Sequence, residues 1–252
     1  MLIDIHAHLW GGRYEVNKRD ILRAMEQYQI DQVFVSGLNG HRPDVEQVEE
    51  ANRQVADFVR AHPGRIRGYV YVSPEHTNAV EVLRRGIEER GMEGTKLWVS
   101  TLCDAPEVDR VAEWIIRYRI PLLVHAFHKA TGQYPNESTG QQVAALARRY
   151  PEMSIIMAHM GGNCYHGIPA IRACPNVFVD YSGSIFRANE LDYALESIGA
   201  ERILFGTDMP GACLVSLGQL EASSATPYER ELICYRNAQR LFPPASLKKE
   251  CV

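Results

Sequence analysis

Residues 2–9 read LIDIHAHL, an apolar, partly β-branched run whose length suits a buried strand. Similar runs recur along the chain, and a longer segment with helical periodicity follows each of them. The other runs are QVFVSGL from Gln32, IRGYVYVS from Ile66, GTKLWVS from Gly94, PLLVHAF from Pro121, SIIMAHM from Ser154, VFVDYSG from Val177 and ILFGTDM from Ile203. This alternation is typical of repeated βα units, and we predict a single-domain (β/α)8 TIM barrel over residues 1–252. An open doubly wound sheet is the alternative, because a sequence does not reveal strand order.

Helices are expected between these strands, and the segments near their starts carry helix-forming signals. The expected starts lie near Lys18, Asp44, Asn78, Ala105, Ser138, Gly167, Ala188 and Thr226. Thr226 is followed by Pro227 and Glu229, which is a helix-capping sequence. No linker or low-complexity tract divides the chain. The longest stretch without periodicity runs from Pro210 to Ser224, where we expect a loop over the mouth of the barrel.

The composition argues against several classes of protein. Hydrophobic residues make up 46% of the chain and charged residues 23%, as in a folded globular domain. A net charge of -4 without a basic run indicates neither a nucleic-acid partner nor a membrane partner. The opening MLIDIHAHLW does not resemble a targeting leader, and the six cysteines show no CxxC spacing. We therefore expect a cytoplasmic protein with reduced thiols and a small-molecule substrate.

Two histidines stand at the end of the first predicted strand. Because side chains on a strand alternate between its faces, His6 and His8 are expected to point to the same side. A strand can present two nitrogen ligands to one metal ion in this way. The pair alone is a weak signal, since His-x-His also occurs by chance.

Other metal-competent side chains come late in later strands. His125 ends the predicted fifth strand, His159 the sixth and Asp208 the eighth. The carboxyl ends of all strands of a parallel barrel meet at one face, where barrel enzymes carry their sites. Burying unpaired imidazoles and a carboxylate there would cost several kcal/mol, about 1–3 for each group, unless something satisfies them. A bound cation would do so.

The donor types narrow the choice of metal and suggest its chemistry. Nitrogen and oxygen ligands without thiolates suit Zn2+ best, and Mn2+, Fe2+ and Ni2+ also fit. We predict a metal held by His6, His8, His125 and Asp208, with a position left for an activated water. Asp208 and His159 are the predicted catalytic residues: Asp208 would accept the proton of the water, and His159 would polarise a substrate carbonyl or move a proton.

These motifs resemble those of the amidohydrolase superfamily, in particular its amidohydrolase-2 branch of TIM-barrel, metal-dependent hydrolases. The resemblance rests on DIHAHL, VHAF, MAHMGG, FGTDMP and NAQRLF, which occur in the expected order over essentially the whole chain. By position, it implies that His6, His8, His125 and Asp208 are the metal ligands. It implies that His159 acts on the substrate in a one-metal enzyme and binds the second ion in a two-metal enzyme.

The resemblance leaves the metal count open. Two-metal members of the superfamily bridge their ions with a carboxylated lysine or a glutamate from the fourth strand. Lys96 is the candidate in this chain, but it lies nearer the start of its predicted strand than a bridge requires. We therefore expect one ion per chain, with Lys96 as a structural or substrate-facing amine.

Four further residues are candidates for substrate contact. Trp98 follows Lys96 by two residues and is expected to face the mouth as an apolar wall. His128 lies in the loop after the fifth strand, and Arg187 lies just past the seventh. Arg187 could hold a substrate carboxylate with two hydrogen bonds, and Arg42 is a second candidate for that role. The alternative for each of them is an ordinary structural or solvated side chain.

The expected activity is hydrolysis of a C–N or C–O bond in a small amide, lactone or cyclic ester by metal-activated water. The alternative is a metal-dependent, non-oxidative decarboxylase of a small carboxylated substrate, with aromatic molecules among the candidates, because the same branch includes such enzymes. A nuclease of the TatD type is disfavoured, because the fourth strand lacks the glutamate that bridges its metals. The resemblance also leaves room for a homodimer.

Overall fold

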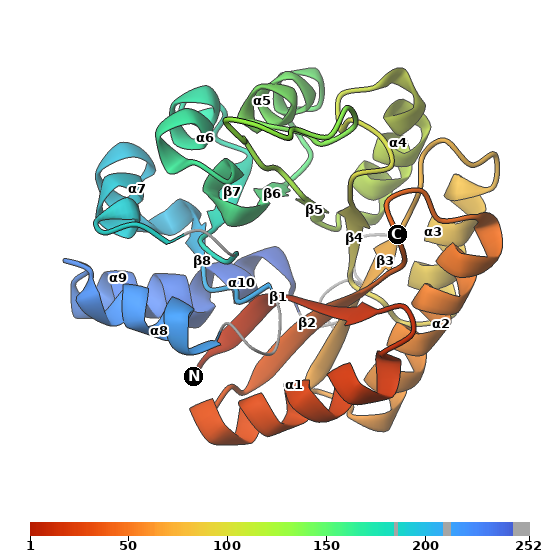
Figure 1. The fold of residues 1–252 in the computed structure, drawn as a ribbon, viewed down its shortest axis with the longest axis horizontal. Helices are drawn as coiled ribbons and strands as arrows, with labels where there is room; N and C mark the ends of the chain where they lie inside the picture. Colours follow the sequence, from red (N-terminus) through yellow and green to blue (C-terminus); the bar gives the residue numbers. More distant parts are fainter. Residues whose placement is uncertain (184–185, 209–212, 244–252) are drawn as a thin grey trace.

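Eight parallel strands form one sheet in the order β1 to β8, with the helices outside it (Figure 1). The computed structural model describes residues 1–183, 186–208 and 213–243. The strands are β1 Ile3–Trp10, β2 Gln32–Leu38, β3 Ile66–Tyr71, β4 Gly94–Leu97, β5 Leu122–Val124, β6 Ile155–Met157, β7 Val177–Asp180 and β8 Ile203–Leu204. Each strand pairs in parallel with the next one along the chain, as repeated βα units require.

The first and last strands meet, which closes the barrel. The amide of Ile5 donates to the carbonyl of Phe205 at 3.0 Å, and the amide of Asp208 donates to the carbonyl of His6 at 2.7 Å. The predicted TIM barrel is confirmed, and the open-sheet alternative is wrong.

The helices alternate with the strands and surround the barrel (Figure 1). They are α1 Tyr14–Tyr28, α2 Val45–Ala61, α3 Ala79–Glu88, α4 Asp109–Tyr118, α5 Gly140–Arg149, α6 Cys164–Ile171, α7 Glu190–Ile198, α8 Cys213–Ala222, α9 Pro227–Glu231 and α10 Asn237–Leu241. Short helical turns lie at η1 Pro106–Val108, η2 Ala158–Gly161, η3 Ala200–Arg202 and η5 Leu232–Arg236. Asp44 and Thr226 begin α2 and α9 with complete capping boxes. Among the described residues, no helix has both the length and the apolar character that a membrane span requires.

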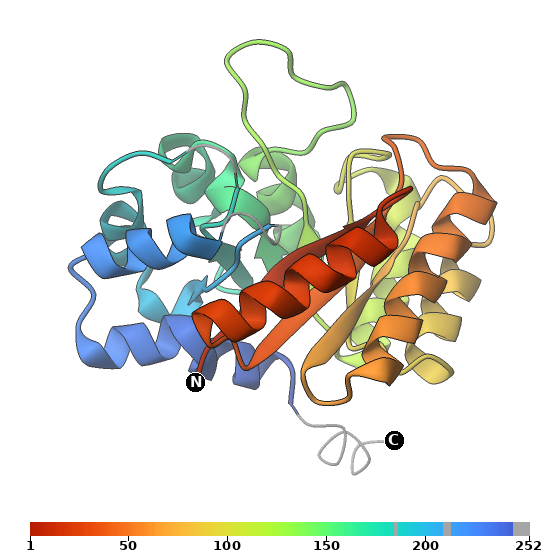
Figure 2. The same ribbon diagram turned by 60° about the horizontal axis from the view of Figure 1, so that its bottom comes forward.

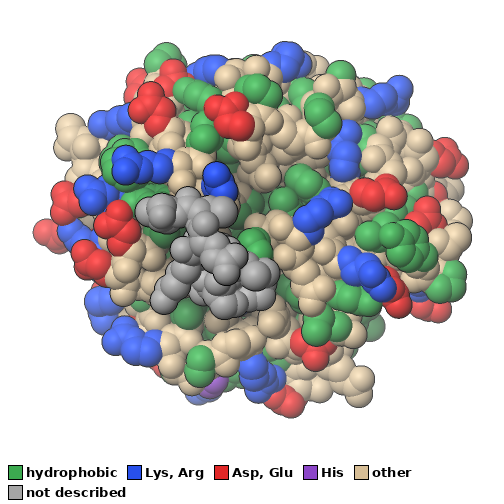
Figure 3. Space-filling view, turned by 180° about the vertical axis from the view of Figure 1, so that it is seen from behind, with side chains coloured by type: hydrophobic (Ala, Val, Ile, Leu, Met, Phe, Trp, Pro, Cys, Tyr) green, Lys and Arg blue, Asp and Glu red, His purple; other side chains and the backbone are tan. Residues whose placement is uncertain are grey.

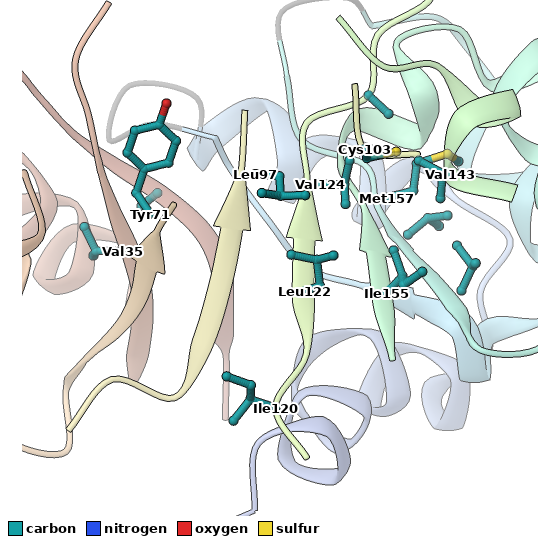
Figure 4. Packing of buried hydrophobic residues seen from close by; sticks show 14 of the residues in the cluster. Val35, Tyr71, Leu97, Cys103, Ile120, Leu122, Val124, Val143, Ile155 and Met157 are labelled. Carbon is teal, nitrogen blue, oxygen red and sulfur yellow. The ribbon is translucent and has the colours of Figure 1, made fainter. Parts of the chain in front are cut away.

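The core has two parts, because successive strand residues point to opposite faces of the sheet. Leu97, Val124 and Met157 are neighbours in register on β4, β5 and β6. They belong to the larger apolar cluster, which also contains buried residues of the helices (Figure 4). A second cluster takes alternate strand residues and fills the barrel interior. It comprises Ile3, Ile5, Phe34, Tyr69, Leu123, Ile156, Ala158, Phe178, Leu204, Ala238 and Phe242.

Two expectations about the elements are wrong. Strands β5 to β8 end earlier than predicted, so that His125, His159 and Asp208 lie just beyond strand ends. The stretch from Pro210 to Ser224 was expected to be a loop, but Cys213–Ala222 forms α8; residues 210–212 lie outside the described ranges. The apolar residues of α8 do not cluster on one side, since Leu214 and Val215 are exposed whereas Cys213 and Leu220 are buried. Without an apolar stripe the helical period was not visible.

The loops at one end of the barrel differ greatly in length. The segment between β5 and α5 rises far above the strands (Figure 2). On the face seen in Figure 3, acidic and basic side chains are interspersed rather than gathered into one charged patch.

Candidate metal centre

His6 and His8 point to the same place from β1, as the period of two predicts. Both side chains are buried, and their Nε2 atoms lie 3.1 Å apart. Asp208 brings its Oδ1 to 3.4 Å from His6 Nε2 and to 3.2 Å from His8 Nε2. The structure therefore gathers three of the four predicted ligands around one point.

Side chains from two other strands, β7 and β2, hold the outer nitrogens of both rings. His6 Nδ1 lies 3.0 Å from Asp180 Oδ2, an acceptor, so Nδ1 carries the proton and Nε2 keeps its lone pair. His8 Nδ1 lies 2.8 Å from Ser36 Oγ. Asp180 and Ser36 were not identified from the sequence. Asp180 had a visible signal, because it is a polar residue at the end of the apolar run VFVD.

The charge states of this group follow from its burial and its neighbours. Burial and the charge of Lys96 hold the pKa of His6 well below its usual value. Burial likewise lowers the pKa of His8. Burial raises the pKa of Asp208, but the charge of His159 and a hydrogen bond with His8 outweigh it, and the net pKa is lowered. At neutral pH the group is thus two neutral rings and a carboxylate.

These donors fit a divalent cation. Ligand atoms about 2.1 Å from a tetrahedral ion are about 3.4 Å apart, close to the separations between the three donor atoms. Each donor can turn a lone pair to the same point, and buried lone pairs facing one another are unfavourable without a positive charge between them. Nitrogen and oxygen donors accept Zn2+ and Mn2+ among other ions.

His125 and His159 form a second pair beside this group. His125 Nδ1 and His159 Nε2 are 3.1 Å apart, and the His6 and His159 ring centroids are 5.0 Å apart. His125 thus lies next to His159 rather than within the group of His6, His8 and Asp208. Burial lowers the pKa of His125 to about 4.

The backbone places His159 and Asp208 in an uncommon conformation. Their φ angles are 59° and 67°, in the left-handed region that non-glycine residues seldom adopt. Asp180 Oδ1 accepts from the amide of His159 at 3.1 Å, and the carbonyl of His6 accepts from the amide of Asp208. Strain of this kind is concentrated at functional sites, where surrounding contacts hold it.

Lys96 lies closer to this group than expected. Strand β4 ends at Leu97, so Lys96 is its penultimate residue, and its Nζ is 3.1 Å from His6 Nε2. The expectation that Lys96 stands too near the start of its strand is wrong, because β4 is shorter than predicted. Its side chain is fully buried, and burial lowers its pKa to about 8.

Rings line one side of the mouth, as predicted for Trp98. Trp10 lies 5.4 Å from His8 and 5.4 Å from Trp98, measured between ring centroids. His41 continues the row at 5.2 Å from Trp98, and Tyr134 lies 4.6 Å from His41. The row joins the His8 ring to the tall loop between β5 and α5.

The other predicted substrate residues are bound elsewhere. Arg187 pairs with Glu190, with 3.1 Å between Nη1 and Oε1. The His128 ring stacks on the His166 ring, with 4.1 Å between the ring centroids. Among the described residues, neither Arg187 nor His128 contacts a histidine of the site.

The family model described as Amidohydrolase matches residues 3–243 of the chain, which includes every residue of the site above. The chain belongs to this family. The amidohydrolase resemblance identified from the motifs is therefore confirmed.

Relatives of this amidohydrolase carry more than one activity in their names. A gamma-resorcylate decarboxylase from Polaromonas sp. (strain JS666 / ATCC BAA-500) is 26% identical over 88% of this chain and 86% of the relative. A dihydroxybenzoic acid decarboxylase structure from Polaromonas sp. JS666, with bound manganese and the inhibitor 2-nitroresorcinol, has a TM-score of 0.74 and 21% identity over 96% of both chains. A 4-oxalomesaconate hydratase from Rhodopseudomonas palustris has a TM-score of 0.75 and 19% identity over 99% of this chain and 98% of that chain. At 19% and 21% identity, the likeness to these two solved structures establishes the fold alone.

Proposed function

We propose that the protein is a metal-dependent, non-oxidative decarboxylase of a small carboxylated aromatic molecule. The observation that carries the proposal is the likeness to gamma-resorcylate decarboxylase over nearly the full length of both chains, together with the histidine and aspartate group at the mouth. The first expectation from the sequence was hydrolysis. Decarboxylation is now preferred, because relatives with named activities are decarboxylases or a hydratase.

We place one divalent cation at His6, His8 and Asp208, and we keep His125, which lies outside that group and next to His159, as the proposed fourth ligand. Bound there, the cation would supply positive charge for the substrate's carboxylate and neighbouring oxygens. Zn2+ suits the donors, and the manganese in the Polaromonas structure makes Mn2+ the second ion to test. With one ion, Lys96 is a buried amine beside His6 rather than a bridge.

His159 is placed to deliver the proton that the reaction needs. In decarboxylation the C–C bond to the carboxylate breaks, carbon dioxide leaves, and the electron pair left on the ring carbon takes a proton. His159 Nδ1 lies 3.2 Å from the carbonyl oxygen of Ser182, which only accepts, so the Nδ1 proton is held there. His159 Nε2 is then the atom that exchanges a proton with the substrate, and His125 Nδ1 lies 3.1 Å from it.

The mouth supports a planar substrate. Trp98 and Trp10 present aromatic faces and edges beside His8, and such rings pack well on another aromatic ring. The arginine that we expected to bind the carboxylate is not supported at Arg187, because Glu190 already pairs with it. The carboxylate would instead be bound by the cation and the nearby Lys96.

A substrate panel separates the two candidate activities. Purified protein reconstituted with Mn2+ or Zn2+ would be incubated with hydroxybenzoates and, separately, with lactones and amides. We expect carbon dioxide release from one or more ortho-hydroxylated benzoates and no acid release from the lactones and amides. Hydrolysis of a lactone or amide without any decarboxylation would reject the proposal and restore the hydrolase alternative.

A further inference from the structure

One buried carboxylate near the site has no part in the function proposed above. Glu137 lies in the tall loop between β5 and α5, and its side chain is only 2% exposed. Its Oε1 is 3.0 Å from His125 Nε2, the ring atom that faces away from His159. The carboxylate therefore contacts His125, a predicted metal ligand, on the side of the ring away from His159.

The same carboxylate is also held by its own loop. Lys129 Nζ is 2.7 Å from Glu137 Oε2 and 2.8 Å from Oε1. Gln133 Nε2 donates to Oε2 at 2.9 Å. The loop closes below these contacts, where the amide of Phe127 donates to the carbonyl of Ser138 at 2.8 Å. Contacts within the loop therefore fix the position of Glu137 independently of His125.

The contact determines which nitrogen of His125 carries the proton. An ionised carboxylate has only acceptor atoms, so a neutral His125 meets it favourably only with the proton on Nε2. The lone pair then sits on Nδ1, on the side of His159. With the proton on Nδ1, a lone pair would face the carboxylate at 3.0 Å, which is repulsive.

We propose that Glu137 is a positioning residue that holds His125 in the Nε2-protonated tautomer, so that Nδ1 is its metal-binding atom. The proposal rests on the proposed function only in taking His125 as a ligand. It also links the tall loop to the metal centre, because Lys129 and Gln133 fix the carboxylate that orients the ring.

The first test reads the tautomer directly and needs neither metal nor substrate. Metal-free protein with 15N-labelled histidine would be studied by long-range 1H–15N NMR, with the His125 signals assigned by their loss in His125→Asn. We expect the Nε2-protonated tautomer in the wild type and in Glu137→Gln, whose side-chain oxygen still accepts. We expect mixed tautomers in Glu137→Ala. An Nδ1-protonated ring in the wild type, or an unchanged ring in Glu137→Ala, would overturn the proposal.

The second test measures binding of Zn2+ alone, by competition with a chromophoric chelator. Loss of an outer partner of a ligating histidine typically weakens metal binding about 10- to 100-fold, and we expect a loss of that size in Glu137→Ala. Glu137→Gln should recover much of the affinity. Lys129→Met and Gln133→Ala are matched controls, since each removes a loop contact but leaves the acceptor for His125.

The controls separate positioning from loop folding. If Lys129→Met or Gln133→Ala weakens Zn2+ binding as much as Glu137→Ala does, the role of Glu137 is to fold the loop and the proposal fails. A negative substrate panel would reject the decarboxylase but leave the tautomer result standing. The two failures are therefore distinguishable.

Discussion

His159 is held more firmly than a loop histidine normally is. Its amide donates to Asp180, its Nδ1 faces the carbonyl of Ser182, and its backbone is fixed in the left-handed region. Nε2, the other ring nitrogen, lies 3.1 Å from His125 Nδ1. A side chain fixed in this way can exchange a proton with a bound molecule at a defined position.

Replacing His159 tests its assigned role. In His159→Gln we expect kcat to fall about 10²- to 10⁴-fold, because the proton donor is lost, while most of the metal is retained. The measurements are turnover and metal content on the same sample. His62→Gln, at the end of α2, is the control and should keep both. Loss of the metal in His159→Gln would instead make His159 a ligand.

The sequence predicted residues of the metal centre only where the alternation of side chains along a strand, or the end of an apolar run, pointed to them. His6 and His8 were found because they lie two apart on one strand, and Asp208 because it follows an apolar run. Asp180 was missed although it also ends an apolar run, because only the structure shows that it contacts His6. Glu137 was missed because its role depends on the His125 ring that packs beside it in space. Sequence spacing carries no information on such contacts.

At the scale of elements, the turn after β6 is tightly constrained by its backbone conformation and its packing. Four consecutive residues, His159 to Gly162, have positive φ angles. A Cβ atom on Gly162 would lie 2.6 Å from the Phe127 ring, and one on Gly167 of α6 would lie 2.1 Å from the carbonyl oxygen of Met160. Glycine at both positions lets α6 and the β5 loop pack against the turn that carries His159.

Gly162→Ala tests this packing. Gly64 has a similar φ, 78° against 74°, but open space around its missing side chain. We expect Gly64→Ala to cost about 1–2 kcal/mol of unfolding free energy from its backbone alone. Gly162→Ala should cost about 1–3 kcal/mol more, because it also overpacks against Phe127. Urea unfolding of both variants gives the difference, and equal losses would show that the contact is unimportant.

The number and type of the strands followed from the sequence, whereas their order was known only from the structure and their ends were predicted wrongly. The strands that we predicted extend past the ends of β6 and β8, where the backbone leaves the sheet and places His159 and Asp208. Helix α8 was not predicted, because its sequence has no continuous apolar stripe. In both cases tertiary contacts outweighed the local pattern.

At the scale of the whole molecule, Phe242, directly after α10, closes the end of the barrel away from the site. The Phe242 ring is 4.1 Å from that of Phe34 and 5.8 Å from that of Tyr69, measured between centroids. Arg67 donates to the carbonyl of Phe242 at 3.1 Å and stacks on the Phe34 ring. Ala238 and Phe242 of the closing motif NAQRLF thus fill the base of the barrel.

Phe242→Ala should destabilise the whole domain. The side chain is 1% exposed, and removing a buried aromatic ring costs about 3–5 kcal/mol of unfolding free energy. Tyr228→Ala removes a ring that is 60% exposed and should change the free energy by no more than about 0.5 kcal/mol. Chemical denaturation gives both values. A small loss in Phe242→Ala would mean that the base of the barrel is not part of the cooperative core.

The family was easier to recognise from the sequence than the activity. The strands and the ligand motifs match the amidohydrolase model along residues 3–243. The substrate instead depends on loops such as the tall segment after β5, where Tyr134 reaches the aromatic row.

Elemental analysis of the purified and reconstituted protein tests the central claim most directly, as moles of each divalent ion per chain. We predict one ion in the wild type and its loss in His6→Ala and Asp208→Ala, with both variants still folded by circular dichroism. Full metal content in both variants would contradict the assigned centre. Two ions per wild-type chain would contradict the one-metal site and make Lys96 and His159 ligands.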